Sequence, residues 1–377
     1  MHFEFDDEQK MLRDTVRDLL AKTYGDAEAR RRAVATDPGY STEVWRQLAE
    51  TGILGLTFSE EDGGVGAGPE ELMAVMVEIG RVLAPEPLLD AVVVPGGLIG
   101  ALGSAEQRGR LLPEVAEGSL LLAFAHAEPG VRWPSTTLAT TATPVGDGWT
   151  ISGTKNPVLR GDGAATLVVS AVRPDGTTGL FLVQADAAGV TRTAYRTHDG
   201  LRGAQVVFDG AAAEELGTGD ASAAITEATV RAQAGLCAEA VGAMEESLRL
   251  TSEYLKQRKQ FGVVLAKFQT LTQRAADMYV SLELAQSMNL YATMTLADGI
   301  VDPVVASRTK LQISTAARHI GQEAVQLHGG IGVTAEYPVG HYFSRLTAIE
   351  HTLGGRSEHL KVLADTVSDH EMVDVTG

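Results

Sequence analysis

The segment Tyr254-Leu255-Lys256-Gln257-Arg258-Lys259-Gln260-Phe261-Gly262, followed by Phe268-Gln269, separates two long stretches of helical periodicity. In the stretch after it, four side chains fall on one helix face: Met278, Leu282, Ala285 and Asn289. The next helical stretch, residues 302–328, meets Gly329-Gly330, a pair typical of a helix C-terminus. Long helices that turn back at such breaks predict a helical bundle from about residue 223 to the end of the chain.

Before that bundle, short β-type runs replace the helical periodicity. Short runs rich in β-branched and aromatic residues, separated by turn residues such as Gly146-Asp147-Gly148, predict a β domain. These runs are residues 120–124, 149–151, 166–170, 179–183 and 206–208. Further upstream, Leu12, Val16, Leu19 and Leu20 line one helix face, and a second helix is expected to begin at Ser41-Thr42. We therefore expect an α+β chain with a helical domain over 1–118, a β-barrel or sandwich domain over 119–222 and a four-helix bundle over 223–377.

One glycine-rich run, Gly63-Gly64-Val65-Gly66-Ala67-Gly68, is similar to a phosphate-binding loop. Such a loop follows a strand in dinucleotide-binding domains, whereas Glu60-Glu61-Asp62 precede it here. Pro69-Glu70 come next, and both residues are favourable in the first turn of a helix. We interpret the run as a loop between two helices.

The composition excludes several classes of partner. Of 377 residues, 49 are acidic and 31 are basic, which gives a formal net charge of −18. A surface this negative repels nucleic acid and anionic membranes, so neither is an expected partner. The acidic start and the lack of an apolar run of membrane length predict a cytoplasmic protein. The single cysteine, Cys237, excludes an intrachain disulfide, and the histidine spacing does not indicate a metal site.

Three motifs share a common interpretation. They are the segment 254–262 with Phe268-Gln269, the segment 326–339 (QLHGGIGVTAEYPV), and Ala127-Glu128-Pro129-Gly130 at the start of the β domain. Together they resemble the acyl-CoA dehydrogenase family over essentially the whole chain, closest to the small subunits of heteromeric enzymes of the pimeloyl-CoA dehydrogenase and steroid side-chain-degrading kind. The resemblance implies bound FAD, oxidation of the Cα–Cβ bond of an acyl-CoA to the trans-2-enoyl-CoA, and electron transfer to an electron-transfer flavoprotein.

The resemblance also implies which residues contact FAD. These are Arg258, Gln260, Phe261, Phe268, Gln269, Gln326, Gly329 and Gly330. The planar guanidinium of Arg258 suits a diphosphate because it binds two oxygens at once, and Gly329-Gly330 lets the backbone approach a bulky ligand. The alternatives are a solvated basic face around Arg258 and a plain helix stop at the two glycines. By the resemblance, the cofactor is held mainly by the neighbouring subunit.

The catalytic base that the family reaction requires is missing from the sequence. A carboxylate must remove a proton from the α carbon of the thioester. The resemblance places this carboxylate at Leu353 or, in other members, 26 residues before Arg258, at Ala232, and neither side chain accepts a proton. Glu350, one helical turn from Leu353, and Glu239 are the candidate substitutes, with a structural ion pair as the alternative for each.

The positions that cover the flavin in the family are altered as well. The stretch before Glu-Pro-Gly reads Phe124-Ala125-His126-Ala127, and the usual tryptophan and threonine positions read Pro157 and Leu159. Arg132 and Trp133 replace small residues near the thioester, where they either seal a vestigial pocket or receive an anionic acyl end, with loop packing as the alternative. A chain that keeps the residues donated across an interface but loses those around its own flavin looks like half of a shared site.

These observations predict the small subunit of an α2β2 acyl-CoA dehydrogenase, in which a paralogous large subunit supplies the flavin-ring pocket and the general base. Two alternatives stay open. In the first, the chain is a catalytically silent scaffold subunit of such a complex. In the second, it is a homotetrameric enzyme with a relocated base such as Glu350. The acyl group is also open, and steroid side chains, dicarboxylates and branched chains all remain candidates.

Overall fold

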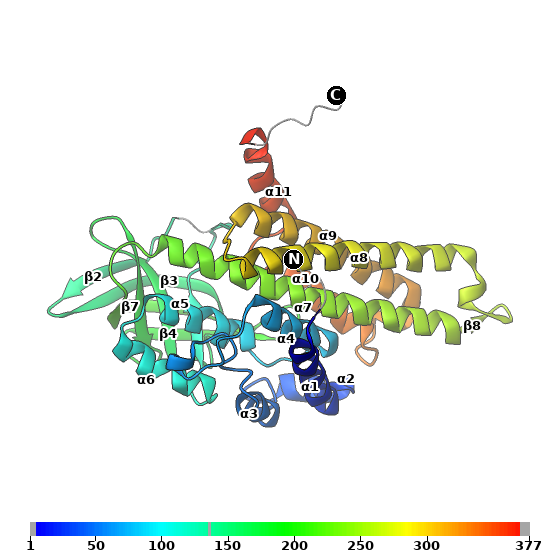
Figure 1. Cartoon of the computed structure of the whole chain (residues 1–377), viewed down its shortest axis with the longest axis horizontal. Helices are drawn as coiled ribbons and strands as arrows, with labels where there is room; N and C mark the ends of the chain where they lie inside the picture. Colours follow the sequence, from blue (N-terminus) through cyan, green and yellow to red (C-terminus); the bar gives the residue numbers. More distant parts are fainter. Residues whose placement is uncertain (1–4, 135–136, 370–377) are drawn as a thin grey trace.

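The computed structural model describes residues 5–134 and 137–369, which form a helical N-terminal block, a β barrel and a C-terminal helical bundle (Figure 1). The longer helices of the N-terminal block are α1 (Asp7–Tyr24), α2 (Ala27–Ala35), α3 (Thr42–Glu50), α4 (Pro69–Val82), α5 (Val94–Leu102) and α6 (Ala105–Ala116). Two shorter segments join them, the 3-10 turn η1 (Glu60–Asp62) and the π-helical turn η2 (Leu88–Val93).

Helix starts in this block follow from local capping. The Asp6 side chain accepts a hydrogen bond from the backbone N–H of Gln9 and so caps α1. Helix α4 begins at Pro69, and the Glu71 carboxylate accepts a hydrogen bond of 2.8 Å from the N–H of Gly68. The glycine-rich run 63–68 is therefore the loop before α4, as its sequence predicts.

The middle of the chain forms a closed sheet. Its strands are β1 (Leu122–Ala125), β2 (Thr141–Val145), β3 (Gly148–Leu159), β4 (Thr166–Val172), β5 (Thr178–Gln184), β6 (Val190–Arg196) and β7 (Arg202–Leu216). Hydrogen bonding runs in the order β1-β4-β2-β3-β7-β5, and β5 pairs again with β4, so the circuit closes into a barrel. The inward-facing side chains of these strands form a core of their own.

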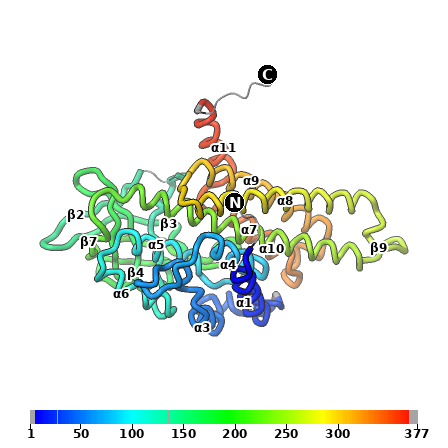
Figure 2. The backbone as a smooth tube through the Cα atoms, in the orientation of Figure 1, coloured from blue at the N-terminus to red at the C-terminus, as the bar shows by residue number. Residues whose placement is uncertain are grey.

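Three long helices dominate the C-terminal bundle. It consists of α7 (Ser222–Gln257), the hairpin of β8 (Lys259–Gln260) and β9 (Val263–Val264), the turn η3 (Leu265–Lys267), α8 (Gln269–Ala297), α9 (Pro303–His328), the turn η4 (Gly329–Val333), α10 (Val339–His351), α11 (Arg356–Asp365) and the turn η5 (Val367–Asp369). Figures 1 and 2 show that α7 and α8 run side by side along the long axis of the molecule and meet at the hairpin, far from the barrel. The stripe Met278, Leu282, Ala285 and Asn289 of α8 is buried, as predicted.

The N-terminal block and the bundle share one hydrophobic core. Helix α4 crosses α7 at two glycines, where a Cβ on Gly80 would collide with the carbonyl oxygen of Glu239 and a Cβ on Gly242 with that of Val77. Glycine at these positions lets the two backbones touch. None of the helices within residues 5–134 and 137–369 combines the length and apolar character that crossing a membrane requires.

A buried ion-pair network links the three parts of the chain. Arg345 of α10 donates two hydrogen bonds, of 2.6 and 2.7 Å, to the Glu239 carboxylate of α7. Its third nitrogen donates to Asp199, in the turn before β7, at 2.7 Å. Arg30 of α2 donates to the backbone carbonyl of Leu83 at 2.7 Å and, at 3.5 Å, to that of Asp199. The network fixes the orientation of α7 against the barrel.

Candidate functional site

Two sequence-predicted motifs meet at the end of the bundle that is farthest from the barrel. Tyr254, in the last turn of α7, lies with its ring 4.5 Å from that of His328, which precedes Gly329. Tyr337 completes the cluster, 4.9 Å from His328. Segments separated by about 70 residues thus form one aromatic cluster, and it sets the glycine pair beside the base of the hairpin.

The hairpin that carries Arg258 is exposed and basic. Between residues 256 and 269 the chain has Lys256, Arg258, Lys259 and Lys267 and no acidic residue, although the whole molecule is strongly acidic. Within the described part of the chain, no side chain pairs with the Arg258 guanidinium. This tip therefore presents concentrated positive charge to an anionic group from outside the subunit.

The backbone of the hairpin holds Arg258 in place. The N–H of Leu265 donates to the carbonyl oxygen of Arg258 at 2.8 Å and closes the loop on the end of α7. Phe261 adopts a left-handed conformation with φ 52°, and 92% of its surface is exposed. Its ring meets that of Phe268 edge to face at 6.2 Å. An apolar ring held outward at the cost of backbone strain is typical of a residue that acts on another molecule.

The glycine pair leaves the backbone at the end of α9 accessible. Gly329 has φ 65°, and a Cβ on either Gly329 or Gly330 would meet nothing within 4 Å. Gln326 is exposed on the preceding turn, and Gln260 and Gln269 are exposed on the hairpin side. Amide donors, open backbone and a guanidinium fit the diphosphate half of a dinucleotide cofactor. The hairpin segment and the end of α9, which carry the eight predicted cofactor-binding residues, therefore lie at the same end of the bundle.

The two positions expected for a catalytic base are both apolar, and Gln233, next to Ala232, contacts Leu353. Leu353 lies in the turn between α10 and α11, and its carbonyl oxygen accepts hydrogen bonds of 3.0 Å from Gln233 Nε2 and His359 Nε2. Ala232, next to Gln233 on α7, is 3% exposed. The turn that carries Leu353, a predicted base position, is thus held against α7 by these hydrogen bonds.

Neither substitute carboxylate faces that turn as a free group. Glu350 is buried, with its carboxylate 3.7 Å from the guanidinium of Arg318 on α9. Glu239 is bound by Arg345 in the network described above. Each acid therefore has an ion-pair partner within the subunit, as expected for a structural role.

A tryptophan covers the same turn from the barrel side. The ring of Trp133 lies 4.2 Å from the His359 ring, and a Cβ on Gly354 would sit 2.7 Å from it. Arg132, by contrast, is exposed to solvent. Trp133 thereby fills the space directly above Gly354.

The positions expected beside a flavin ring are occupied by packed side chains. The rings of Phe124 and His126 stack at 5.3 Å with only 7° between their planes. His126 Nδ1 lies 2.9 Å from Ser170 Oγ. Pro157 is exposed and Leu159 is half-buried. These residues provide less hydrogen-bonding capacity toward an isoalloxazine than the family pattern does.

Two buried lysines were not found by sequence reasoning. Lys155 Nζ donates to the Glu128 carboxylate at 2.8 Å, and burial lowers the pKa of Lys155 to about 8. Lys310 Nζ donates to the carbonyl oxygens of Ile349 and Gly354 at 2.7 and 3.1 Å, and burial lowers its pKa to about 8 as well. Lys310 holds the end of α10 and the turn after it in place. The only sequence signal for either was Glu128 in the Ala-Glu-Pro-Gly motif.

Metal and thiol chemistry find no support in the described residues. Within 5–134 and 137–369, no three His, Cys, Asp or Glu side chains come close enough to hold a metal ion. Cys237 is buried among helices, and burial raises the pKa of its thiol to about 12. The thiol is therefore protonated and packs as a small core residue.

Comparison with known proteins covers all three parts of the chain. The family models for the acyl-CoA dehydrogenase N-terminal, middle and C-terminal domains match residues 6–119, 123–210 and 222–367. The chain is 31% identical to the acyl-CoA dehydrogenase IpdE2 of Mycobacterium tuberculosis over 96% of this chain and 98% of that protein. It is 30% identical to a short-chain-specific acyl-CoA dehydrogenase of Clostridium acetobutylicum over 90% of this chain and 92% of that protein.

Solved structures agree in fold along the entire length. A variant of the Tcur3481-Tcur3483 steroid acyl-CoA dehydrogenase superposes with a TM-score of 0.89 at 35% identity, covering 96% of this chain and 98% of the other. The ChsE4-ChsE5 complex of Mycobacterium tuberculosis gives a TM-score of 0.89 at 26% identity, covering 99% of this chain and 100% of the other. The predicted order of helical domain, β barrel and helical domain is confirmed, and the chain belongs to the acyl-CoA dehydrogenase family.

Proposed function

We propose that this chain is the small subunit of a heteromeric, FAD-dependent acyl-CoA dehydrogenase that forms a trans-2-enoyl-CoA. In this arrangement the tip at Arg258 reaches into the flavin site of a paralogous large subunit, which supplies the flavin-ring pocket and the general base. The observation that carries the proposal is the contrast between the intact, exposed cofactor-binding tip and the apolar pair Ala232 and Leu353.

The residues of this chain have specific tasks in that complex. Arg258 binds and orients the diphosphate, and the amides of Gln260, Gln269 and Gln326 donate or accept hydrogen bonds beside it. Phe261 and Phe268 pack against the adenosine half and exclude water there. When bound, FAD accepts the hydride that leaves the β carbon of the substrate. This chain contributes no group at Leu353 that would take the α proton.

An apolar face on α8 supports assembly with other subunits. Tyr279, Val280 and Leu284 are each more than half exposed, and they lie on one side of the helix. Two of the similar solved structures, the Tcur3481-Tcur3483 steroid acyl-CoA dehydrogenase and the ChsE4-ChsE5 complex, are each named for a pair of chains. Both facts favour a heteromer, and the electrons of the reduced flavin would then pass to an electron-transfer flavoprotein.

Two alternatives make different predictions. A silent scaffold would assemble with its partner without contributing to flavin binding, and the unpaired Arg258 argues against it. A homotetramer would need Glu350 as its base, and the ion pair of Glu350 with Arg318 argues against that.

The decisive experiment compares flavin content with and without the partner chain. The chain is purified alone and together with the family member encoded beside it, and the flavin absorbance per chain is measured. We expect flavin only in the complex, and Arg258→Ala to lower its flavin content by about tenfold or more because a bidentate contact is lost, with assembly intact. Lys267→Ala, a charge-matched change at the same tip, should leave the flavin content near that of the wild type.

Three results would contradict parts of the proposal. Full flavin loading and acyl-CoA oxidation by the chain alone would refute the shared site. Unchanged flavin in the Arg258→Ala complex would support the scaffold. A loss of turnover in Glu350→Gln, with the fold and flavin content preserved, would support the homotetramer.

A further inference from the structure

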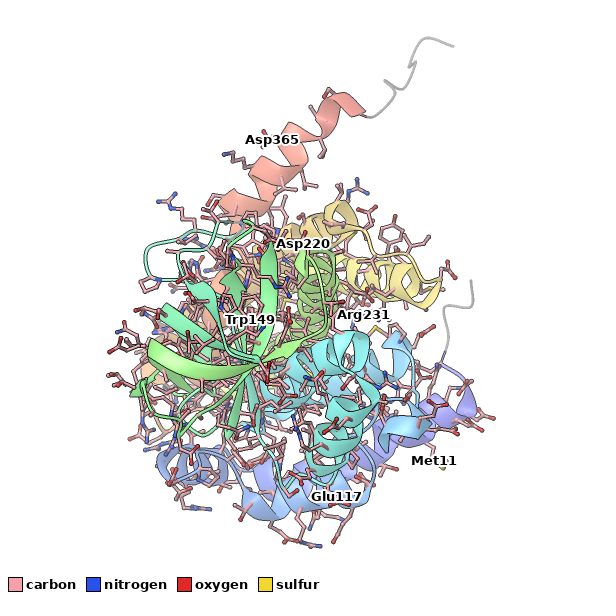
Figure 3. All side chains as sticks on the ribbon, turned by 90° about the vertical axis from the view of Figure 1, so that its left-hand side faces the viewer. Met11, Glu117, Trp149, Asp220, Arg231 and Asp365 are labelled. Atoms are coloured by element: carbon pink, nitrogen blue, oxygen red, sulfur yellow. The ribbon has the colours of Figure 1, made fainter. Side chains whose placement is uncertain are left out.

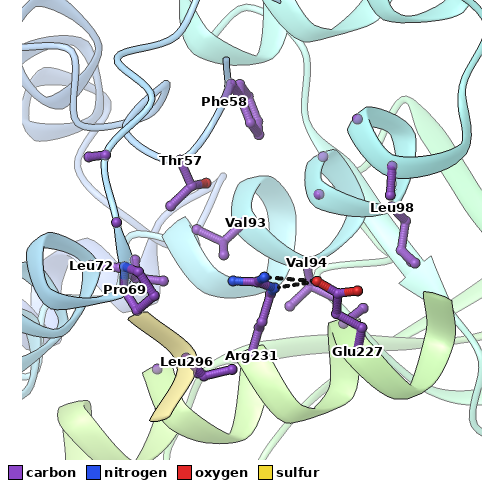
Figure 4. Close-up of a pocket in the computed structure, with 18 of the residues that line it drawn as sticks. Thr57, Phe58, Pro69, Leu72, Val93, Val94, Leu98, Glu227, Arg231 and Leu296 are labelled. Atoms are coloured by element: carbon purple, nitrogen blue, oxygen red, sulfur yellow. Dashed lines mark hydrogen bonds and ion pairs between the residues drawn. The ribbon is translucent and has the colours of Figure 1, made fainter. Parts of the chain in front are cut away.

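A cavity of about 360 Å³ lies between the N-terminal block and the bundle. It is enclosed by α5, the first half of α7, the start of α4 and the end of α8, and Figure 4 shows side chains from these elements facing one another. Figure 3 shows Arg231, at its rim, between the N-terminal helices and the bundle. The volume falls in the range of pockets that hold small organic ligands, and most of the lining is apolar.

The cavity lies on the opposite side of α7 from the turn that carries Leu353. Consecutive residues of an α-helix are rotated by about 100°, so Arg231 and Gln233 point in roughly opposite directions. Gln233 contacts the Leu353 carbonyl, whereas Arg231 and Gly235 line the cavity. The cavity and the turn at Leu353 therefore lie on different faces of α7, and the flavin content of the complex separates a test of the cavity from a test of the proposed flavin site.

The α5 wall is shaped by glycines that packing within the chain does not explain. Gly96 is explained, because a Cβ there would strike the Phe58 ring. A Cβ on Gly97 would meet nothing within 4 Å, and one on Gly100 would have Leu112 Cδ1 as its nearest neighbour, at 3.9 Å. Each glycine within a helix costs about 1 kcal/mol relative to alanine. Gly97 and Gly100 thus enlarge the cavity at a cost in stability.

The charged groups at the rim are already neutralised. Arg231 Nη2 lies 2.8 Å from the Glu227 carboxylate, in an ion pair drawn as a dashed line in Figure 4. The Asp62 carboxylate accepts hydrogen bonds from Arg108, at 3.1 Å, and from the Ser59 hydroxyl, at 2.8 Å. An anionic ligand would lie beside two carboxylates, and a cationic one beside the guanidinium. The rim therefore favours a neutral molecule with one polar group that bonds to Arg231 or Glu227.

From this geometry we propose that the cavity binds a neutral, compact, apolar small molecule whose body packs against Gly97 and Gly100 and whose single polar group lies at the Arg231–Glu227 pair. The apolar walls supply the affinity, since each Å² of apolar surface removed from water contributes about 25 cal/mol. The charge-balanced rim selects against the anionic analogue of the same molecule.

A matched pair of fluorescent probes tests this proposal on the full chain, alone and in its complex. N-phenyl-1-naphthylamine is neutral, and 1-anilinonaphthalene-8-sulfonate has the same ring skeleton with one added negative charge. We expect saturable binding of the neutral probe at one equivalent per chain and at least tenfold weaker binding of the sulfonate at the same site.

Two leucine substitutions locate the site. Gly100→Leu places a side chain in the cavity and should weaken binding of the neutral probe by at least tenfold. Gly109→Leu is the control, because Gly109 lies on α6 outside the cavity and a Cβ there also meets nothing within 4 Å. If Gly100→Leu does not fold, Ala228→Leu fills the cavity from α7 instead.

Flavin content of the complex should be the same in all of these variants, which separates this test from that of the flavin site. The proposal is overturned if the neutral probe shows no saturable binding, if the cavity-filling variant binds it like the Gly109→Leu control, or if the sulfonate competes for the same site with equal affinity.

Discussion

At the scale of single residues, His359 shows how the turn at Leu353 depends on burial. Its side chain is inaccessible to solvent beneath Trp133, and its Nε2 lies 3.0 Å from the Leu353 carbonyl oxygen. Burial, with the nearby positive charge of Lys310 as a second cause, lowers the pKa of His359 from 6.5 to about 4. The neutral imidazole is therefore the form that holds the turn.

This pKa difference predicts a loss of stability in mild acid. Between pH 6.5 and 4 the unfolded chain binds a proton at His359 that the folded chain does not, so stability is complete above pH 6.5 and falls as the pH drops toward 4. The full difference corresponds to about 3 kcal/mol. Urea unfolding of the wild type at pH 7.5 and pH 4 measures it.

The His359→Asn variant is the control, because asparagine keeps a hydrogen-bond donor but does not titrate. It should be less stable than the wild type at pH 7.5 and should lose about 3 kcal/mol less than the wild type between the two pH values. Equal losses in both proteins would mean that His359 is not the group responsible, because the carboxylates of the chain titrate in both proteins.

The residues predicted to contact the cofactor lie in local sequence motifs, whereas the polar groups that hold the turn at Leu353 do not. Arg258 and Gly329 belong to local motifs whose spacing is readable in the chain. Lys310 and Gln233 have no such motif, because their partners lie 39 to 44 and 120 residues away. Which of these polar groups becomes buried is decided by tertiary packing, so the sequence alone did not predict them.

At the scale of elements, the crossing of α4 and α7 depends on glycine. A Cβ on Gly242 would collide with the backbone of Val77, and a main-chain atom cannot rotate away as a side chain does. We expect Gly242→Ala to destabilise the chain by at least about 2 kcal/mol, because the helices must separate. Thermal and urea unfolding measure the change.

Gly109→Ala provides the comparison for that prediction. Its Cβ would meet open space on α6, so this variant should be unchanged or more stable by up to about 1 kcal/mol. If Gly242→Ala were as stable as Gly109→Ala, the close approach of the two backbones at the helix crossing would not be required.

Elements with clear periodicity were predicted, and two strands were missed. The α8 stripe and the end of α9 at His328 agree with the structure because apolar spacing and a glycine stop are local signals. Strand β2 contains Pro144, and β6 is exposed along most of its length, so neither shows an apolar alternation. Both strands form because neighbouring strands pair with them, which is a non-local cause.

At the scale of the whole molecule, the apolar face of α8 predicts how the chain assembles. Val280 and Leu284 are 56% and 54% exposed, so the subunit does not need them for its own core. We expect Leu284→Lys to weaken assembly by at least tenfold in dissociation constant while the thermal stability of the isolated chain stays within a few degrees of the wild type. Light scattering after size-exclusion chromatography measures the assembly state.

Met11→Lys is the control for α8, because Met11 is also an apolar residue that is more than half exposed, on α1, and it is labelled in Figure 3. It should assemble as the wild type does. A Leu284→Lys chain that also assembles normally would show that another surface forms the contact.

The order of the three domains was predictable because each has its own periodicity, and the structure confirms it. The limits at residues 118 and 222 and a cytoplasmic location stay predictions. Pairing with a second subunit stays a proposal, because an interface depends on two surfaces and this sequence describes only one of them.

The exposed tip of the hairpin has a consequence for how the protein is made. Phe261 is held outward beside a basic loop, so a subunit without a neighbour exposes an apolar ring next to several positive charges. An exposed apolar ring of this kind favours contact with other protein surfaces. In the proposed complex, synthesis of this chain together with its partner would keep the Phe261 ring covered.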